Sequence, residues 1–327
     1  MSMEPEFGEF ELIRRFFLKR GAARHGSGVL LGIGDDAALL ELPKGTDLVA
    51  TVDTLVCGTH FLEGANPRSI GHKAMAVNLS DMAAMGATPA WATLALTLPG
   101  VDASWLEEFA AGLLQLGAEH AVELVGGDTT RGPLTVSVQL MGHVPHGTAL
   151  RRSGAGVGDI LAVTGTLGDA AAGLTLLKKS AARPTAQQQA LIRRFDYPAP
   201  RVQLGVAARG VASAAMDLSD GLVGDLPKLA LASGLAAHVT VEKLPLSAAM
   251  LDTIGMEQAR DWALAGGEDF ELLLAVSPDS FPALERSADQ LNLTLTPIGE
   301  LRRGAGVTWS LNGNDFAPSV SGYDHFA

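Results

Sequence analysis

The sequence predicts a mixed α/β protein with two domains. Its 327 residues suffice for two domains of ordinary size. In both halves, short runs rich in Val, Ile, Leu and Thr alternate with segments of helical spacing. Between the halves, residues 146–158 (HGTALRRSGAGVG) are rich in glycine, which is typical of a crossing between domains. We therefore expect one domain over residues 1–148 and a second over residues 149–327.

In the first half, the pattern begins with a helix whose apolar residues share one side. Phe10, Ile13, Phe16 and Phe17 recur at helical spacing within residues 7–20. The other helices of this half are expected at 68–85, where Gly86 and Pro89 follow, and at 103–119. The strands are expected at 29–33, 48–56, 91–98, 121–125 and 134–144.

In the second half, the same alternation starts again after the glycine-rich crossing. Each expected strand is a short apolar run, and each expected helix has its apolar residues on one face. The strands are predicted at 159–164, 213–218, 236–241, 270–276 and 295–300. The helices are predicted at 168–179, from the polar stretch 183–190 onward, at 220–233 and at 279–291.

Composition excludes several classes of protein. Hydrophobic residues make up 47% of the chain and charged residues 18%, so a sizeable core is expected and general disorder is not. The formal net charge of −12, without any run of Lys and Arg, argues against nucleic-acid binding. No apolar stretch approaches the roughly 18 residues of a membrane span, and the N-terminus lacks the pattern of a signal peptide. We expect a cytoplasmic protein.

Five short segments place Asp beside Gly, Ser or Thr after an apolar run. A carboxylate at the end of a strand points into the crevice where α/β proteins bind ligands, and glycine lets the backbone approach a phosphate. Mg²⁺ prefers such oxygen ligands, and a cation relieves the repulsion among clustered carboxylates. The pattern therefore predicts a magnesium-dependent phosphate site. The segments are Gly34-Asp35-Asp36, Thr51-Val52-Asp53-Thr54, Asn78-Leu79-Ser80-Asp81, Gly126-Gly127-Asp128-Thr129-Thr130 and Asp217-Leu218-Ser219-Asp220-Gly221.

Each segment also has a purely structural interpretation. Asp and Ser beside Gly are ordinary residues of turns and helix N-caps, so Asp220 could cap the helix that follows it and Asp128 could shape a turn. The segment 126–132 (GGDTTRG) could instead form a nest of backbone N–H groups for phosphate. Five such segments in one chain favour the functional interpretation.

Other signals narrow the chemistry. Cys57 is the only cysteine, so no intrachain disulfide can form, and we expect it to be a small core residue. His60 has no partner at metal-ligand spacing, which argues against zinc. In GGEDFEL, Glu268 and Asp269 stand between two glycines and a strand, as in a turn or in a loop that faces a substrate. Walker and protein-kinase signatures are absent, so any ATP chemistry uses another fold.

These motifs resemble those of the thiamine-monophosphate kinase family, from about residue 7 to the C-terminus. The family belongs to the aminoimidazole ribonucleotide synthetase-like superfamily, in which elements similar to NLSDMAAMGA and DLSDGL are widespread. GGEDFEL and GYDHF look specific to the thiamine-phosphate branch, and sister branches with a reactive terminal cysteine fit less well. The motifs are GIGDDAAL, VDTLVCGTHF, KAMAVNLSDMAAMGATPAW, VGGDTTRGPL, RSGAGVGD, MDLSDGL, LAGGEDFELL and GYDHF.

The resemblance implies a fold, an activity and a set of site residues. It implies an ATP- and Mg-binding N-terminal domain that pairs its sheet in a homodimer, and a C-terminal α/β domain that completes the active site. The implied reaction is ATP-dependent phosphorylation of thiamine monophosphate to thiamine diphosphate, with several Mg²⁺ ions. The implied metal ligands are Asp36, Thr51, Asp53, Asp81, Asp128, Asp217 and Asp220. The implied ATP contacts are Gly127, Asp128, Arg152 and Ser219, and the implied thiamine phosphate contacts are His60, Glu268 and Tyr323.

Three points remain open at this level. The family often carries a hydroxyl residue before the aspartate at position 53, and this chain has Val52 there. No residue is predicted to act as a catalytic base, because the second pKa of a phosphate monoester is near 6 and the acceptor is already largely ionised. Two alternatives to the kinase are an ATP-dependent ligase of the same superfamily that activates an amide or formyl oxygen, and a non-catalytic nucleotide-binding regulator.

Overall fold

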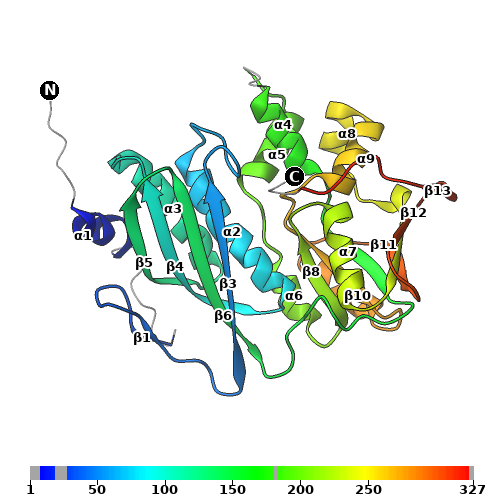
Figure 1. Cartoon of the computed structure of the whole chain (residues 1–327), viewed down its shortest axis with the longest axis horizontal. Coiled ribbons are helices and arrows are strands. Elements are labelled where there is room, and N and C mark those ends of the chain that lie inside the picture. The colour runs from blue at the N-terminus through cyan, green and yellow to red at the C-terminus, as the bar shows by residue number, and fades with distance from the viewer. Residues whose placement is uncertain (1–7, 19–27, 180–182, 324–327) are drawn as a thin grey trace. The chain divides into compact units, whose positions relative to one another are not determined.

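The computed structural model describes residues 8–18, 28–179 and 183–323 (Figure 1). The chain forms two compact units. The first unit comprises Met1–Leu79 and Thr88–His146, and the second comprises Ser80–Ala87 and Gly147–Ala327. The end of helix α2 (Pro67–Ala84) therefore belongs to the second unit although the helix begins in the first.

The first unit is built on a four-stranded sheet in the order β3-β6-β4-β5. Strand β6 pairs antiparallel with both β3 and β4, while β4 and β5 run parallel. Helices α2 and α3 (Ala103–Glu119) lie behind this sheet in the view of Figure 1. The strands are β3 (Thr46–Val56), β4 (Thr88–Leu98), β5 (Glu123–Arg131) and β6 (Thr135–Pro145). The unit begins with α1 (Glu9–Leu12), the π-helix η1 (Ile13–Leu18) and the paired strands β1 (Val29–Leu31) and β2 (Leu39–Leu40).

The sequence pattern explains how this unit packs. In β6, Val136, Val138 and Leu140 are buried and alternate with more exposed residues, so one face of the strand meets the core. Helices α2 and α3 approach closely because each has a glycine at their crossing. A Cβ on Gly71 would overlap the backbone of Phe109 on the facing helix. Only glycine permits this spacing.

The second unit is built on a seven-stranded sheet in the order β13-β12-β9-β11-β7-β10-β8, in which only β12 and β9 are parallel among the described strands. Strand β10 is buried at every position, so its continuous apolar run is covered on both faces. Its strands are β7 (Ile160–Thr164), β8 (Ala212–Leu218), β9 (Ala236–Thr240), β10 (Glu271–Val276), β11 (Leu295–Arg302), β12 (Val307–Leu311) and β13 (Asn314–Phe316). Its helices are α4 (Asp169–Lys178), α5 (Ala186–Asp196), α6 (Val202–Ala208), α7 (Leu222–Ala232), η2 (Val241–Lys243), α8 (Ala248–Ile254), α9 (Met256–Ala265) and α10 (Phe281–Gln290).

The structure confirms the mixed α/β architecture, and most expected elements lie within a few residues of their predicted bounds. Helices α6, α8 and α9 and strands β12 and β13 were not predicted, because they are short or weakly patterned. Phe16 and Phe17 are buried as expected, while residues 7, 19 and 20 of the expected first helix lie outside the described residues. No helix in the described part of the chain is long and apolar enough to cross a membrane.

Candidate active site

The first unit contains a cavity of about 950 Å³ that collects two of the predicted acidic segments. Asp36 and Asp128 both line it, together with Gly127. Arg14 and Phe17 of the N-terminal helical segment line it as well. Asp36 and Asp128 are both exposed to solvent in the structure. The cavity thus combines carboxylates, a glycine backbone and apolar surface within the usual size range of small-molecule sites.

The segment around Asp128 differs from the expected turn. We predicted a strand over 121–125 followed by a turn or phosphate nest, but β5 continues to Arg131 and Asp128 pairs with Ala95 of β4. The placement of Asp128 in a turn or at the end of a strand was therefore wrong. Gly127 has φ +153, and a Cβ there would overlap the backbone of Leu94. The glycine pair marks a bulge rather than the end of the strand, since the pairing of β5 with β4 shifts register between Ala92 and Thr93 and then continues.

Asp53 and Thr51 also lie inside a strand rather than at its end. Both belong to β3, and Asp53 is half-buried. The backbone N–H of Asp53 donates to Asn78 Oδ1 at 3.1 Å. Asn78 is fully buried in α2 and donates through Nδ2 to the carbonyl of Ala74, so it fixes Asp53 relative to the helix. Asn78 belongs to the predicted NLSD segment, but the sequence pattern did not predict this supporting role.

His60 lies in the connection after β3. Its Nδ1 accepts a hydrogen bond from the N–H of Val56 at 3.0 Å. Lys73 of α2 donates to the His60 carbonyl at 3.4 Å. The residue is half-buried, and the hydrogen bond from Val56 fixes the orientation of its ring. Cys57, expected in the core, is half-buried.

In the second unit, Asp217 lies near the end of β8, where a strand-end carboxylate was expected. It is buried, with 7% of its surface exposed, and accepts a hydrogen bond from Ser80 Oγ at 2.8 Å. Ser80 belongs to the second unit by its contacts, as does Asp81, which follows it. The structure therefore joins the predicted segments NLSD and DLSDGL, which are far apart in the sequence.

The turn after β8 is held by Asp225, a residue that sequence reasoning missed. Its Oδ2 accepts the backbone N–H groups of Ser219 and Asp220 at 3.0 and 2.9 Å. Lys228 donates to Asp220 at 2.7 Å and to Asp225 at 2.9 Å. Burial raises the pKa of Asp225, although the hydrogen bond from Lys228 opposes this. The N-cap of α7 is Gly221, so the interpretation of Asp220 as a helix cap was wrong.

Two further motifs converge on the same turn. The N–H of Glu268 donates to the Ser219 carbonyl at 2.8 Å. The N–H of Tyr323 donates to the Asp220 carbonyl at 3.1 Å. Close backbone packing reinforces both contacts, since a Cβ on Gly267 would crowd the Ser219 carbonyl. Ser219, Asp220, Glu268 and Tyr323, predicted from three separate motifs, therefore lie around one turn.

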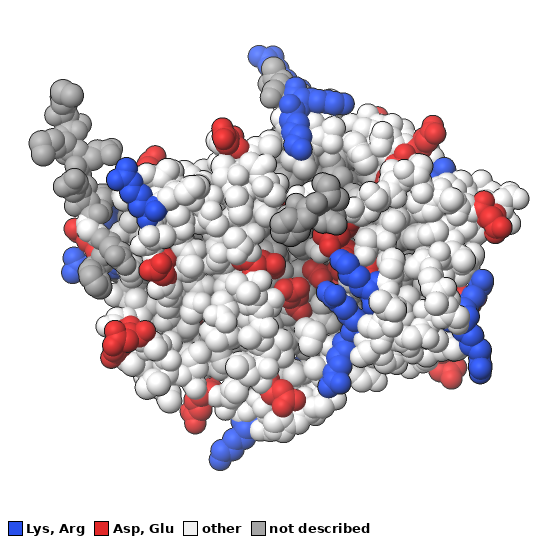
Figure 2. Space-filling view, viewed as in Figure 1, with Lys and Arg blue, Asp and Glu red and all other residues white. Residues whose placement is uncertain are grey.

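Arg152 lies within the glycine-rich crossing and is exposed. Its carbonyl accepts a hydrogen bond from Ser233 Oγ at 2.9 Å, which ties this segment to the end of α7. Most of the face drawn in Figure 2 consists of uncharged residues, with acidic and basic side chains scattered over it.

The predicted metal ligands divide between the units. Among the described residues, no group of three or more His, Cys, Asp and Glu side chains lies close enough to hold a metal by itself. Pairs of carboxylates with phosphate oxygens and water are nevertheless a suitable donor set for Mg²⁺. Asp36 and Asp128, which share the cavity of the first unit, are such a pair. The first unit carries Asp36, Thr51, Asp53 and Asp128, and the second carries Asp81, Asp217 and Asp220.

Comparisons with known proteins agree with this architecture. Residues 34–144 match the model of the AIR synthase related protein N-terminal domain, and residues 156–310 match that of its C-terminal domain. The fold and the site thus define a member of the AIR synthase related class. Within it, the chain is 47% identical over 322 residues to the thiamine-monophosphate kinase of Salmonella typhimurium, which covers 98% of each chain. The chain belongs to the thiamine-monophosphate kinase family.

Solved structures give the same result. The crystal structure of thiamine-monophosphate kinase from Stenotrophomonas maltophilia K279a is similar, with a TM-score of 0.86, 45% identity and coverage of 95% of this chain and 98% of that one. AaThiL complexed with AMPPCP and TMP has a TM-score of 0.78 and 34% identity, covering 100% of this chain and 99% of that one.

Proposed function

We propose that this protein transfers the γ-phosphate of ATP to thiamine monophosphate and releases thiamine diphosphate and ADP. The observation that carries the proposal is the convergence of Ser219, Asp220, Glu268 and Tyr323 around one turn. GGEDFEL and the C-terminal GY are the motifs that resemble the thiamine-phosphate branch, and DLSDGL is the motif shared across the superfamily. Family membership supports the same reaction, and the complex of AaThiL with AMPPCP and TMP supports a nucleotide and a second ligand as substrates.

The residues divide into three proposed roles. Of the residues assigned to the two substrates, the first unit carries Gly127, Asp128 and His60, and the second carries Arg152, Ser219, Glu268 and Tyr323. Acidic residues predominate, and candidate bases are few, as expected where positioning and charge neutralisation drive phosphoryl transfer. We assign ATP contacts to Gly127, Asp128, Arg152 and Ser219, and thiamine phosphate contacts to His60, Glu268 and Tyr323.

Magnesium fits this donor set, because the carboxylates at the cavity of the first unit are exposed and hard. When bound, Mg²⁺ would supply neutralisation of charge on the phosphate oxygens. In the second unit, Lys228 already neutralises part of the charge of Asp220. The residues that would hold the ions are Asp36, Thr51, Asp53, Asp81, Asp128, Asp217 and Asp220.

The reaction needs no strong base in this proposal. A phosphate monoester has a second pKa near 6, so its attacking oxygen is already largely ionised at neutral pH. That oxygen forms a bond to the γ-phosphorus while the bond from the γ-phosphorus to the β–γ bridging oxygen breaks, and ADP leaves with the electron pair. Arg152 would orient the triphosphate, since its planar guanidinium suits phosphate. Incubation with γ-labelled ATP and no acceptor should leave the protein unlabelled, and stoichiometric label on the protein would contradict direct transfer.

We further propose a homodimer that forms through the sheet of the first unit. Strand β3 is an edge strand, and Leu48 and Val52 on it are 53% and 61% exposed. Exposed edges with apolar side chains tend to pair with another chain. Sedimentation equilibrium should give twice the mass of the chain, and Val52→Asp should shift the population toward monomer. A wild-type monomer at micromolar concentration would exclude this assembly.

Product analysis tests the proposed reaction directly. Purified protein is incubated with ATP, Mg²⁺ and thiamine monophosphate, with thiamine and no acceptor as controls, and the products are separated by chromatography. We expect thiamine diphosphate and ADP in equal amounts, only with the monophosphate and only with the metal. Phosphate release with an amide or formyl acceptor instead would favour the ligase. Tight ATP binding without turnover on any acceptor would favour the regulator.

A further inference from the structure

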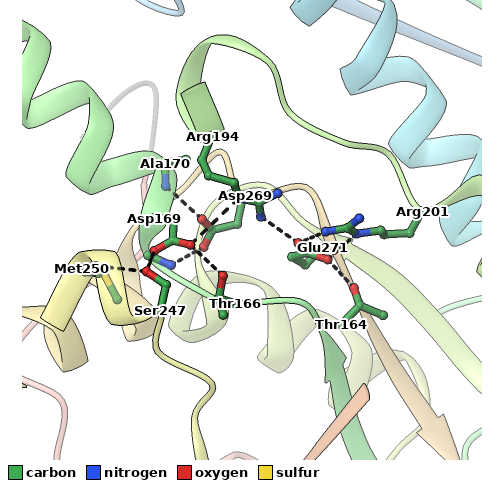
Figure 3. Close-up of polar contacts among 11 residues, drawn as sticks. Thr164, Thr166, Asp169, Ala170, Arg194, Arg201, Ser247, Met250, Asp269 and Glu271 are labelled. Atoms are coloured by element: carbon green, nitrogen blue, oxygen red, sulfur yellow. Dashed lines mark hydrogen bonds and ion pairs between the residues drawn. The ribbon is translucent and has the colours of Figure 1, made fainter. Parts of the chain in front are cut away.

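A buried ionic cluster includes two acidic residues of the GGEDFEL motif, Asp269 and Glu271 (Figure 3). Its centre is Glu271, the first residue of β10, which is fully buried. Its carboxylate accepts hydrogen bonds from Thr164 at 2.6 Å, from Arg194 at 2.7 Å, and from Arg201 Nε and Nη2 at 2.7 and 2.5 Å. Burial opposes ionisation, but the two arginines outweigh it and lower the pKa of Glu271. The residue is therefore a fixed anion that ties β10 to α5, α6 and β7.

Asp269, two residues earlier, anchors the loop to a different element. It is 4% exposed and accepts the backbone N–H groups of Gly168 at 2.6 Å and Ala170 at 3.2 Å, at the start of α4. The interpretation of Asp269 as a loop carboxylate that faces a substrate is wrong, because its side chain is buried. Burial raises its pKa to about 7, against the opposing effect of those N–H groups and of Arg194.

Asp269 and Glu271 alternate along the chain with two residues whose backbone conformation is energetically unfavourable. Glu268 and Phe270 have φ of +69° and +51°, in the left-handed region that residues other than glycine seldom adopt. Such conformations persist only where the surroundings over-determine them, and they gather at functional sites. The N–H groups of Glu268 and Phe270 donate to the carbonyls of Ser219 and Leu218, so the strained residues face the turn after β8.

Stability alone is a poor explanation for the cluster. A buried ion pair is often no more stabilising than well-packed apolar residues of similar volume, because desolvation offsets the attraction. The guanidinium of Arg201, by contrast, offers a rigid fork with directional donors. Arg201 holds the carboxylate of Glu271, and the N-terminus of α4 holds that of Asp269. Together these contacts fix the path of the backbone from Asp269 to Glu271.

We propose that Asp269 and Glu271 are positioning residues for acceptor binding, which hold Glu268 in its left-handed conformation beside the Ser219–Asp220 turn. Asp269 acts through the start of α4, and Glu271 acts through Arg194 and Arg201. The inference rests on the proposed function, in which Glu268 contacts thiamine monophosphate. Neither Asp269 nor Glu271 touches the substrate in this account.

The test compares Asp269→Asn with Asp169→Asn. Asp169 is a matched control, because it is 3% exposed in the same region and its carboxylate accepts hydrogen bonds from Thr166 and Ser247, with only a long 4.0 Å ion pair to Arg194 Nε, whereas that of Asp269 accepts backbone N–H groups at the start of α4. We expect Asp269→Asn to raise the KM for thiamine monophosphate about tenfold while the KM for ATP changes less than about twofold. Hydrogen exchange at the amides of Glu268 and Phe270 should accelerate about tenfold in the same variant. Asp169→Asn should leave both readouts close to wild type.

A second variant keeps the test decisive if Asp269→Asn does not fold. Arg201→Lys retains the charge but loses the fork, and we expect the same pattern with a smaller rise in KM, about threefold. Equal loss of melting temperature in Asp269→Asn and Asp169→Asn, with unchanged KM and unchanged exchange at residues 268 and 270, would overturn the inference.

Failure of the proposed function has a different signature. If wild-type protein neither binds nor turns over thiamine monophosphate, the acceptor assignment fails for wild type and variants alike. Hydrogen exchange then still decides whether Asp269 holds the loop. Faster exchange confined to Asp269→Asn retains that part of the inference, and unchanged exchange rejects it.

Discussion

The acidic side chains of the two units differ in what surrounds them. In the first unit, Asp36 and Asp128 are exposed at a cavity. In the second unit, Asp225, Asp269 and Glu271 are buried, and each accepts hydrogen bonds from backbone N–H groups or from cationic side chains. The same residue types therefore serve two purposes. The exposed carboxylates are available to cations and phosphate-bearing ligands, while the buried ones hold loops that carry other functional residues.

This difference shows that residue type alone does not tell which carboxylates can act as ligands. A carboxylate in water keeps its charge at little cost, whereas a buried one needs partners that then occupy its lone pairs. Glu271 accepts four hydrogen bonds from three residues, so little capacity remains for a metal. Asp217 and Asp220 are intermediate cases, since Ser80 and Lys228 bind them but the motif suggests a ligand role.

The largest expected effect is a loss of stability on substitution of a buried acidic residue of the second unit. Glu271→Ala leaves Arg194 and Arg201 without their carboxylate, and we expect the free energy of unfolding to fall by about 3–5 kcal/mol. Urea denaturation followed by circular dichroism measures this loss. Glu285→Gln, on the exposed side of α10, should change stability by no more than about 0.5 kcal/mol. Similar losses in the two variants would remove the distinction between buried and exposed acids.

The raised pKa of Asp269 should be detectable in the pH dependence of the free energy of unfolding. Its pKa rises from 3.8 in the unfolded chain to about 7 in the folded protein, so the folded state binds the proton more tightly. This contribution makes the free energy of unfolding fall as pH rises from about 4 to 7, by up to about 4 kcal/mol. Asp269→Asn lacks this contribution, so the free energy of unfolding of wild type should fall relative to that of the variant over that range. The charged neighbours Arg194 and Asp169 remain in both proteins. Parallel pH profiles would show that Asp269 titrates normally.

For the exposed carboxylates of the first unit, we expect substitution to reduce activity without reducing stability. We expect Asp128→Asn to lower kcat about hundredfold at saturating Mg²⁺, equal to about 2.7 kcal/mol, because the site loses negative charge where cations bind. Its melting temperature should stay within about 2 °C of wild type, because exposed substitutions seldom alter stability much. Asp315→Asn, an equally exposed aspartate in β13, is the matched control and should keep full activity. A near-normal rate for Asp128→Asn would place the metal site elsewhere.

The smallest expected effect concerns Asp102, an exposed acidic residue with a structural role. Asp102 caps α3 and accepts the N–H groups of Ser104 and Trp105 at 2.9 and 3.1 Å. The hydrogen bond from the Ser104 hydroxyl is the main cause that lowers its pKa, so its contribution to stability is present above the unfolded pKa and disappears as pH falls below it. Asp102→Ala should cost about 1 kcal/mol with unchanged turnover, and Asp102→Asn only a few tenths. Loss of activity in Asp102→Ala would contradict a purely structural role.

Sequence reasoning succeeded where a local pattern carries the information. The long helices, five of the strands of the seven-stranded sheet and the acidic motifs followed from periodicity and spacing, as with α3 at Ala103–Glu119. It missed α8 and α9, whose short lengths give too few repeats for a clear period. It also ended β5 before the glycine pair, where the strand instead forms a bulge and continues to Arg131.

What the sequence alone determined is the mixed α/β class, most elements and the family motifs, because these depend on residues that are neighbours in the chain. What only the tertiary structure decided is which acidic residues are buried and which segments meet. Asp225, Asn78 and Asp269 hold functional segments through contacts with backbone that the local pattern does not specify. The Ser219–Asp220 turn gathers GGEDFEL and the C-terminal GY because sheet order and close glycine packing, rather than sequence distance, determine which backbones are adjacent.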